Sequence, residues 1–97
     1  MMTTHKKTQE VLDIFAEISK VPRCSKKEEK IAAWLADWAR RQGFSYEMDE
    51  VRNIRIDVPA TPGHEHAPIV VIQGHMDMVC EKTPESQHNF CTDPIKL

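Results

Sequence analysis

A histidine and an aspartate two residues apart, His75 and Asp77, follow closely after a continuous run of apolar β-branched residues at 69–72. Side chains two positions apart in a strand point the same way, so the carboxylate of Asp77 can orient the imidazole of His75. A carboxylate in this role fixes the tautomer of the histidine, whose other ring nitrogen then faces a metal ion. The same pair also fits a hydrogen-bonded histidine at a strand end, beside an aspartate that caps a turn.

The cysteines and a second pair of histidines give weaker signals. Cys24, Cys80 and Cys91 are an odd number at spacings that match no disulfide framework, which is typical of a reducing compartment. The last two cysteines also lack the close C-x-x-C partners that structural zinc sites usually have. His64 and His66 lie in a proline-rich loop, where we expect solvent-exposed side chains rather than a metal site.

Two amphipathic helices come first in the predicted order of elements. Apolar residues recur at three- and four-residue steps over residues 8–20, with Thr8 as the N-cap and Pro22 beyond the end. Ser25 and Glu28 match a capping box, which predicts that a second helix begins there. This helix should end at Gly43. Its apolar face, which we expect to pack in the core, consists of Ile31, Trp34, Leu35, Trp38 and Ala39.

Strands should follow the helices. The hydrophobic period changes from 3.6 to 2 after Gly43, which predicts half-buried strands at residues 44–48 and 54–58 joined by a short turn. The run at residues 69–72 predicts another strand, covered on both faces as in the middle of an α/β sheet. Its carboxyl end is where open α/β sheets carry their chemistry. The sequence therefore predicts an α/β fold with two N-terminal helices packed on a small mixed β-sheet.

Length, composition and charge exclude several classes of protein. Ninety-seven residues make one domain at most, and 40% apolar with 29% charged residues is ordinary globular composition. No apolar run approaches the roughly 20 residues that span a bilayer, and the first residues do not resemble a secretory signal. The formal net charge is −2 and the basic residues are scattered, which argues against nucleic acid as a partner. We therefore expect a cytoplasmic protein with neither membrane nor nucleic-acid partners.

Nearly the whole chain resembles one enzyme family. The stretch IVVIQGHMDMV, residues 69–79, is similar to the apolar strand and H-x-D-M-V segment of the di-zinc exopeptidases. Other parts of the chain resemble the beginning of a bacterial Xaa-His dipeptidase, also called aminoacyl-histidine or cytosolic non-specific dipeptidase. These parts are the segments FAEISKVPRCS and HNFCTDPIKL, the pairs Gly43-Phe44 and Asn53-Ile54, and the loop at 59–63. Arg52 departs from this pattern, since relatives commonly have glycine there.

The resemblance implies a reaction and a role for each member of the pair. His75 would be a zinc ligand, and Asp77 would be the catalytic carboxylate that supports the metal site without being a primary ligand. The reaction would be the hydrolysis of Xaa-His and other dipeptides by metal-activated water, with two zinc ions, or manganese or cobalt in their place. Residues 1–97 would be the N-terminal segment of the catalytic domain, an incomplete part of a three-layer zinc-exopeptidase fold. The general base, the remaining ligands and a lid or dimerisation domain would lie outside them.

Two other interpretations stay open beside the dipeptidase. The chain could be a non-catalytic interaction module, which a reading frame continuing past Leu97 into further metal motifs would exclude. It could also be a small metal-binding protein whose ligands are His75, Cys80, His88 and Cys91. If the dipeptidase interpretation holds, the isolated chain should be inactive, because one histidine cannot hold two zinc ions. It should also self-associate through the open edge of the strand at residues 69–72.

Overall fold

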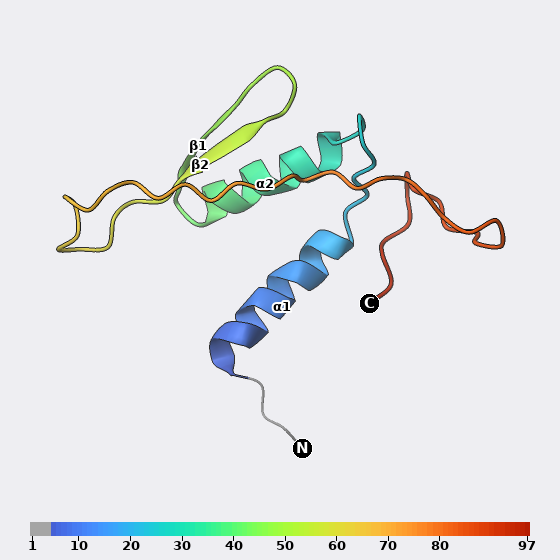
Figure 1. The fold of residues 1–97 in the computed structure, drawn as a ribbon, viewed down its shortest axis with the longest axis horizontal. Helices are drawn as coiled ribbons and strands as arrows, with labels where there is room; N and C mark the ends of the chain where they lie inside the picture. The colour runs from blue at the N-terminus through green and yellow to red at the C-terminus, as the bar shows by residue number, and fades with distance from the viewer. Residues whose placement is uncertain (1–4) are drawn as a thin grey trace.

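Two helices followed by a two-stranded sheet make up the regular structure of residues 5–97, which the computed structural model describes (Figure 1). Helix α1 spans Lys6–Ser19 and helix α2 spans Glu29–Arg41. Strands β1 (Ser45–Met48) and β2 (Ile54–Asp57) pair antiparallel. The predicted α/β order of elements is confirmed. Parallel pairing, which a mixed sheet requires, is confined in the described residues to one isolated bridge between Cys24 and Met78.

Helix α1 begins earlier than the sequence pattern predicts and lies apart from the sheet (Figure 1). Its N-cap is His5, whose Nδ1 accepts a hydrogen bond from the amide of Lys7 at 3.2 Å, so the prediction of Thr8 as the cap is wrong. A histidine ring nitrogen can satisfy a free amide at a helix start as a hydroxyl does. The apolar stripe of α1 is 40 to 66% exposed and comprises Val11, Leu12, Ile14 and Phe15.

Helix α2 forms the core with the hairpin. Four apolar residues of α2 are buried, namely Ile31, Ala32, Ala36 and Ala39. Trp38, half-buried, packs edge-on against Phe44 with ring centroids 5.9 Å apart, which confirms its predicted packing role. The helix ends as predicted, because Gly43 adopts a left-handed φ of +78° directly after the last turn.

The start of α2 differs from the predicted capping box. The helix begins at Glu29 with Glu28 as its N-cap, and no side chain caps its free amides. The carboxylate of Glu28 instead accepts a hydrogen bond from the amide of Lys26 at 2.7 Å, and the hydroxyl of Ser25 points away to Asp77. The capping-box prediction is therefore wrong, because a long-range partner takes the serine hydroxyl.

The turn between β1 and β2 is closed by two backbone hydrogen bonds, from the amide of Asp49 to the carbonyl of Asn53 and from the amide of Arg52 to the carbonyl of Asp49, and by the carboxylate of Asp49. Asp49 accepts hydrogen bonds from the amides of Val51 and Asn53 and from the side-chain amide of Asn53. Arg52, which lies between Val51 and Asn53, adopts a left-handed φ of +70°, a conformation that favours glycine. The structure thus gives a physical reason why glycine suits this position better than arginine.

Residues 69–72 form no strand in the described chain. Their side chains are 81 to 95% exposed, and the orange trace through them in Figure 1 runs without a neighbouring strand. The prediction of a strand covered on both faces is wrong here, because β1 and β2 pair only with each other and leave this run unpaired. A radius of gyration of 16.5 Å, against about 12–13 Å for a compact domain of this length, agrees with much uncovered apolar surface.

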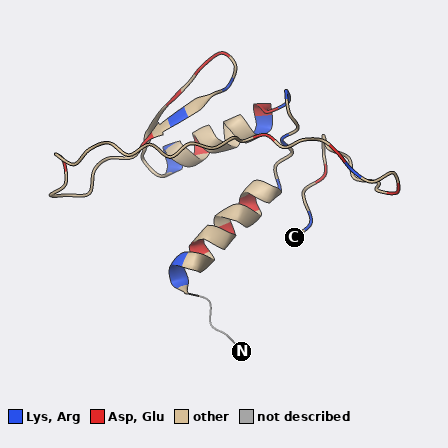
Figure 2. Cartoon of the chain, in the orientation of Figure 1, with Lys and Arg blue, Asp and Glu red and all other residues tan. Residues whose placement is uncertain are grey.

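Charges of both signs are interspersed over the elements (Figure 2). On the outer face of α2, Asp37 pairs with Arg40 at 3.2 Å and with Arg41 at 3.1 Å, as expected of a solvated helix face. Within residues 5–97, the helices are too short and too polar to cross a membrane.

Candidate functional site

His75 and Asp77 lie side by side, in the geometry expected of an imidazole that is oriented by a carboxylate. Nδ1 of His75 lies 3.2 Å from Oδ1 of Asp77 and 2.8 Å from the backbone carbonyl oxygen of the same residue. Both of these partners are hydrogen-bond acceptors at neutral pH, so Nδ1 must carry the hydrogen. In the neutral ring, Nε2 then presents its lone pair.

The lone pair on Nε2 is open to a ligand. The side chain of His75 is 82% exposed, and no described residue forms a hydrogen bond with Nε2. This arrangement is that of a metal-ligating histidine, whose second ring nitrogen donates to a carboxylate or a carbonyl group. The geometry therefore suits a metal ion bound through Nε2 of His75.

Asp77 is held from its other side by Ser25. The hydroxyl of Ser25 donates a hydrogen bond to Oδ2 of Asp77 at 2.6 Å, across 52 residues of sequence. This hydroxyl, helped by the backbone amide of Asp77 and by His75, holds the pKa of the Asp77 carboxyl below its ordinary value. The opposing effect, partial burial, raises the pKa and is outweighed. Asp77 is thereby kept as a carboxylate that accepts from both neighbours.

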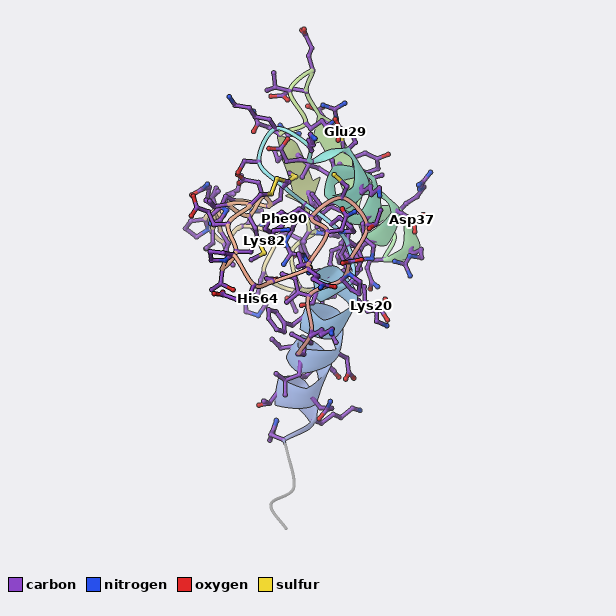
Figure 3. All side chains as sticks on the ribbon, turned by 90° about the vertical axis from the view of Figure 1, so that its right-hand side faces the viewer. Lys20, Glu29, Asp37, His64, Lys82 and Phe90 are labelled. Carbon is purple, nitrogen blue, oxygen red and sulfur yellow. A yellow bond between two sulfur atoms is a disulfide. The ribbon has the colours of Figure 1, made fainter. Side chains whose placement is uncertain are left out.

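The backbone around Ser25 is joined to the segment that carries the pair. The amide of Ser25 donates to the carbonyl of Met78 at 3.1 Å, and the amide of Met78 donates to the carbonyl of Arg23 at 2.9 Å. A disulfide between Cys24 and Cys80, with Cα atoms 5.5 Å apart, closes the same junction (yellow in Figure 3). The cysteine spacings, which match no disulfide framework, did not predict this pairing. This pairing follows from the contact between two distant segments, which a count of spacings does not reveal.

The other predicted metal ligands do not converge. Cys80 is in the disulfide, Cys91 is free and exposed, and His88 packs edge-on against Phe90 with ring centroids 5.1 Å apart. Figure 3 shows Phe90 next to Lys82, whose ammonium lies 5.5 Å from the ring centroid. Within the described residues no three histidine, cysteine or acidic side chains gather where they could hold a metal ion. The interpretation as a small metal-binding protein is thus wrong in its ligand set.

The hollows in the surface do not contain the pair either. One hollow lies beyond Met78 and is lined by residues between 78 and 82, between 86 and 90 and at 93–96, including Lys82 and Phe90. Neither His75 nor Asp77 lines it. We therefore place the candidate site by the chemistry of His75 and Asp77 and not by the shape of the surface. These residues fit one metal ligand and its orienting carboxylate, and a complete centre needs further donors.

Sequence reasoning located His75 and Asp77 but missed the part that Ser25 has in the site. A spacing of two residues is a local signal, whereas the contact between Ser25 and Asp77 depends on the path of the chain over 52 residues. The serine was visible only as a helix-cap pattern.

Comparison with known proteins identifies the relatives of the chain. No family model matches it. The chain is 44% identical over 88 residues to the cytosol non-specific dipeptidase of Escherichia coli, a match that covers 91% of this chain and 18% of that protein. It is 33% identical over 81 residues to the LysW-lysine hydrolase of Deinococcus radiodurans, covering 80% of this chain and 20% of that protein.

A solved structure gives the same result. The aminoacylhistidine dipeptidase of Vibrio alginolyticus superposes with a TM-score of 0.81 at 42% sequence identity, over 87% of this chain and 17% of that one. The chain thus spans less than a quarter of the length of each of these relatives. Its two helices and hairpin superpose on part of that dipeptidase, which supports the predicted class of an incomplete α/β domain. As the sequence resemblance indicated, the chain is homologous to a segment of bacterial dipeptidases, which are hydrolases, as its similarity to the E. coli and Vibrio proteins shows.

Proposed function

We propose that this chain is the N-terminal segment of the catalytic domain of a metal-dependent dipeptidase, to which it contributes one metal ligand and the carboxylate that orients it. The contact of His75 Nδ1 with Asp77 Oδ1 at 3.2 Å, with Nε2 facing solvent, carries the proposal. The substrates would be Xaa-His and other dipeptides, in keeping with the names of the E. coli and Vibrio relatives. The remaining ligands, the general base and a lid or dimerisation domain would come from outside residues 1–97.

In this proposal the residues of the chain position the reaction centre. When bound, a pair of zinc ions, or of manganese or cobalt ions, polarises the scissile carbonyl and acidifies a water molecule. Nε2 of His75 would hold one of the ions. Asp77 would keep the hydrogen on Nδ1 and the ring in a fixed direction, and its negative charge would raise the basicity of Nε2.

The place of action and the assembly follow from the same proposal. We infer that the protein works in the cytosol, the compartment in the name of the E. coli relative. We also infer that an isolated chain associates with itself, because residues 69–72 expose four apolar side chains in a row. In such an assembly, a second chain would cover residues 69–72, which the rest of a catalytic domain would cover in the longer protein.

The experiment that tests the proposal compares His75→Ala with Asp77→Asn in the longer protein that contains this chain. The first change removes a metal bond, so metal content and turnover of a Xaa-His dipeptide should fall together. The second keeps the shape and removes the charge, so metal should largely remain while turnover falls about 10- to 100-fold. Asp37→Asn, on the exposed face of α2, is the matched control and should change neither. Parental turnover in the Asp77→Asn variant would remove the role assigned to that carboxylate.

The isolated chain gives a second test. We expect no turnover of a Xaa-His dipeptide with added zinc or manganese, because the described residues supply a single ligand. Activity that copurifies with the chain and disappears in the His75→Ala variant would contradict the proposal that the rest of the centre lies elsewhere.

A further inference from the structure

We propose that Ser25 is a positioning residue for the metal ligand, acting through Asp77 on His75. The catalytic consequence rests on the dipeptidase function proposed above, whereas the positioning itself is a property of this chain. The three side chains form a continuous hydrogen-bonded series in which the serine hydroxyl fixes the carboxylate and the carboxylate fixes the imidazole.

The distances define the series. Oγ of Ser25 lies 2.6 Å from Oδ2 of Asp77, in the range of a short hydroxyl-to-carboxylate bond. Oδ1 of the same carboxylate lies 3.2 Å from Nδ1 of His75, which also lies 2.8 Å from the backbone carbonyl oxygen of Asp77. Each carboxylate oxygen therefore has its own partner, and rotation of the Asp77 side chain would break both bonds. A carboxylate fixed in this way offers the imidazole one orientation, while a carboxylate bonded only to His75 could turn with the ring.

The structure holds the serine in place independently of its hydroxyl. Two backbone hydrogen bonds connect Ser25 and Arg23 to Met78, at 3.1 and 2.9 Å. Neither bond uses the side chain of Ser25, so loss of the hydroxyl leaves this junction closed. The hydroxyl thus adds contacts to the Asp77 carboxylate and, at 3.3 Å, to the carbonyl of Met78.

A merely local role for Ser25 does not fit. The sequence pattern suggests a cap for α2, but α2 has no side-chain cap bond and begins four residues later, at Glu29. The hydroxyl donates to the carboxylate of Asp77, and its oxygen also lies 3.3 Å from the carbonyl oxygen of Met78 in the same segment. Its closer partner is the carboxylate, which is the group in contact with the candidate ligand.

The first test reads the orientation of His75 without any metal. In the chain with ¹⁵N-labelled histidine, at a pH where the ring is neutral, His75 should show two well-separated nitrogen resonances, from a protonated Nδ1 and an unprotonated Nε2. His75→Gln assigns these resonances among the five histidines. We expect Ser25→Ala to bring the two shifts toward each other as the tautomers mix, and Ser25→Thr, which keeps the hydroxyl, to restore the separation. Ser45→Ala, at an exposed serine on β1, is the control.

Unchanged nitrogen shifts of His75 in a folded Ser25→Ala variant would overturn the inference. Unchanged backbone amide shifts at Ser25 and Met78 would show that the junction of the two segments is intact, which separates a positioning effect from local unfolding.

The second test uses zinc and the longer protein that contains this chain. Ser25→Ala should weaken zinc binding by about 3- to 10-fold, the equivalent of one hydrogen bond, and lower kcat more than it raises KM for a Xaa-His dipeptide. Ser25→Thr should recover both. Failure of the parent protein to bind zinc or cleave dipeptides would refute the proposed function, and the nitrogen shifts would still decide the inference. An active parent with unchanged zinc affinity and kcat in Ser25→Ala would overturn the inference alone.

Discussion

Arg52 is the residue at which substitution can measure the conformational cost of the hairpin turn. Its φ of +70° is a left-handed conformation that costs a non-glycine residue about 1–2 kcal/mol. Glycine removes this cost but loses more freedom on folding, by about 0.5–1 kcal/mol. The guanidinium also lies 3.6 Å from the carboxylate of Glu29, an exposed ion pair worth about 0–1 kcal/mol. The terms are similar in size, so Arg52→Gly alone does not isolate the conformational cost.

A comparison of Arg52→Gly with Arg52→Ala removes the ion pair with Glu29 from the difference in stability and leaves the conformational terms. Both variants lose the ion pair, and the left-handed cost that alanine retains exceeds the extra freedom that glycine loses on folding, so the glycine variant should have the higher free energy of unfolding by about 1 kcal/mol. In a domain of this size that corresponds to a midpoint about 4–8 °C higher. Urea and thermal unfolding of dilute protein, followed by the fluorescence of Trp34 and Trp38 on α2, measure the difference. Equal stability of the two variants would refute the reasoning, because it would mean that residue 52 leaves the left-handed region in solution.

Three further predictions concern the other features of the chain. Replacement of two apolar residues within 69–72 by lysine should lower the mass measured by light scattering toward that of one chain. A parent chain that is already monomeric would contradict self-association through these residues. Cys24→Ser should lower the free energy of unfolding by about 4 kcal/mol without reductant, because the disulfide closes a loop of 56 residues. With reductant present, the same substitution should have a far smaller effect. Hydrogen bonds from Asn53 first, and then from the turn backbone, lower the pKa of Asp49. Its stabilising contribution is therefore present above the ordinary carboxyl pKa and lost as the pH falls through the lowered value, an acid step in stability that Asp49→Asn should lack.

Local patterns in the sequence predicted the elements whose partners are close along the chain. The period-2 segments became β1 and β2, because a short turn brings them together and the Asp49 carboxylate closes that turn. The glycine at the end of α2 has the expected left-handed φ. The apolar face of α2 packs as predicted, with Ile31 and Ala39 buried. Each of these features depends on residues within one element or in elements that follow one another directly along the chain.

The predictions that failed needed partners that the local pattern does not contain. Residues 69–72 have the composition of a buried strand, yet a strand forms only where neighbouring strands supply hydrogen bonds, and β1 and β2 pair only with each other. Exposure of at least 81% at these residues therefore follows from the absence of a pairing strand among residues 5–97 and not from the composition.

The candidate site combines both kinds of information. The two-residue spacing of His75 and Asp77 let the sequence place an imidazole next to its carboxylate, and the structure shows the two groups in contact. Ser25 shows why such reasoning stops there, because its hydroxyl had two possible uses: a nearby helix start and a carboxylate 52 residues away. The capping bond would satisfy an amide that water can reach, whereas the carboxylate accepts a charge-assisted bond that is about twice as strong. The stronger bond is the one that forms. The sequence pattern predicts Ser25 as a helix cap, whereas in the structure its hydroxyl binds the carboxylate that orients the metal ligand we propose.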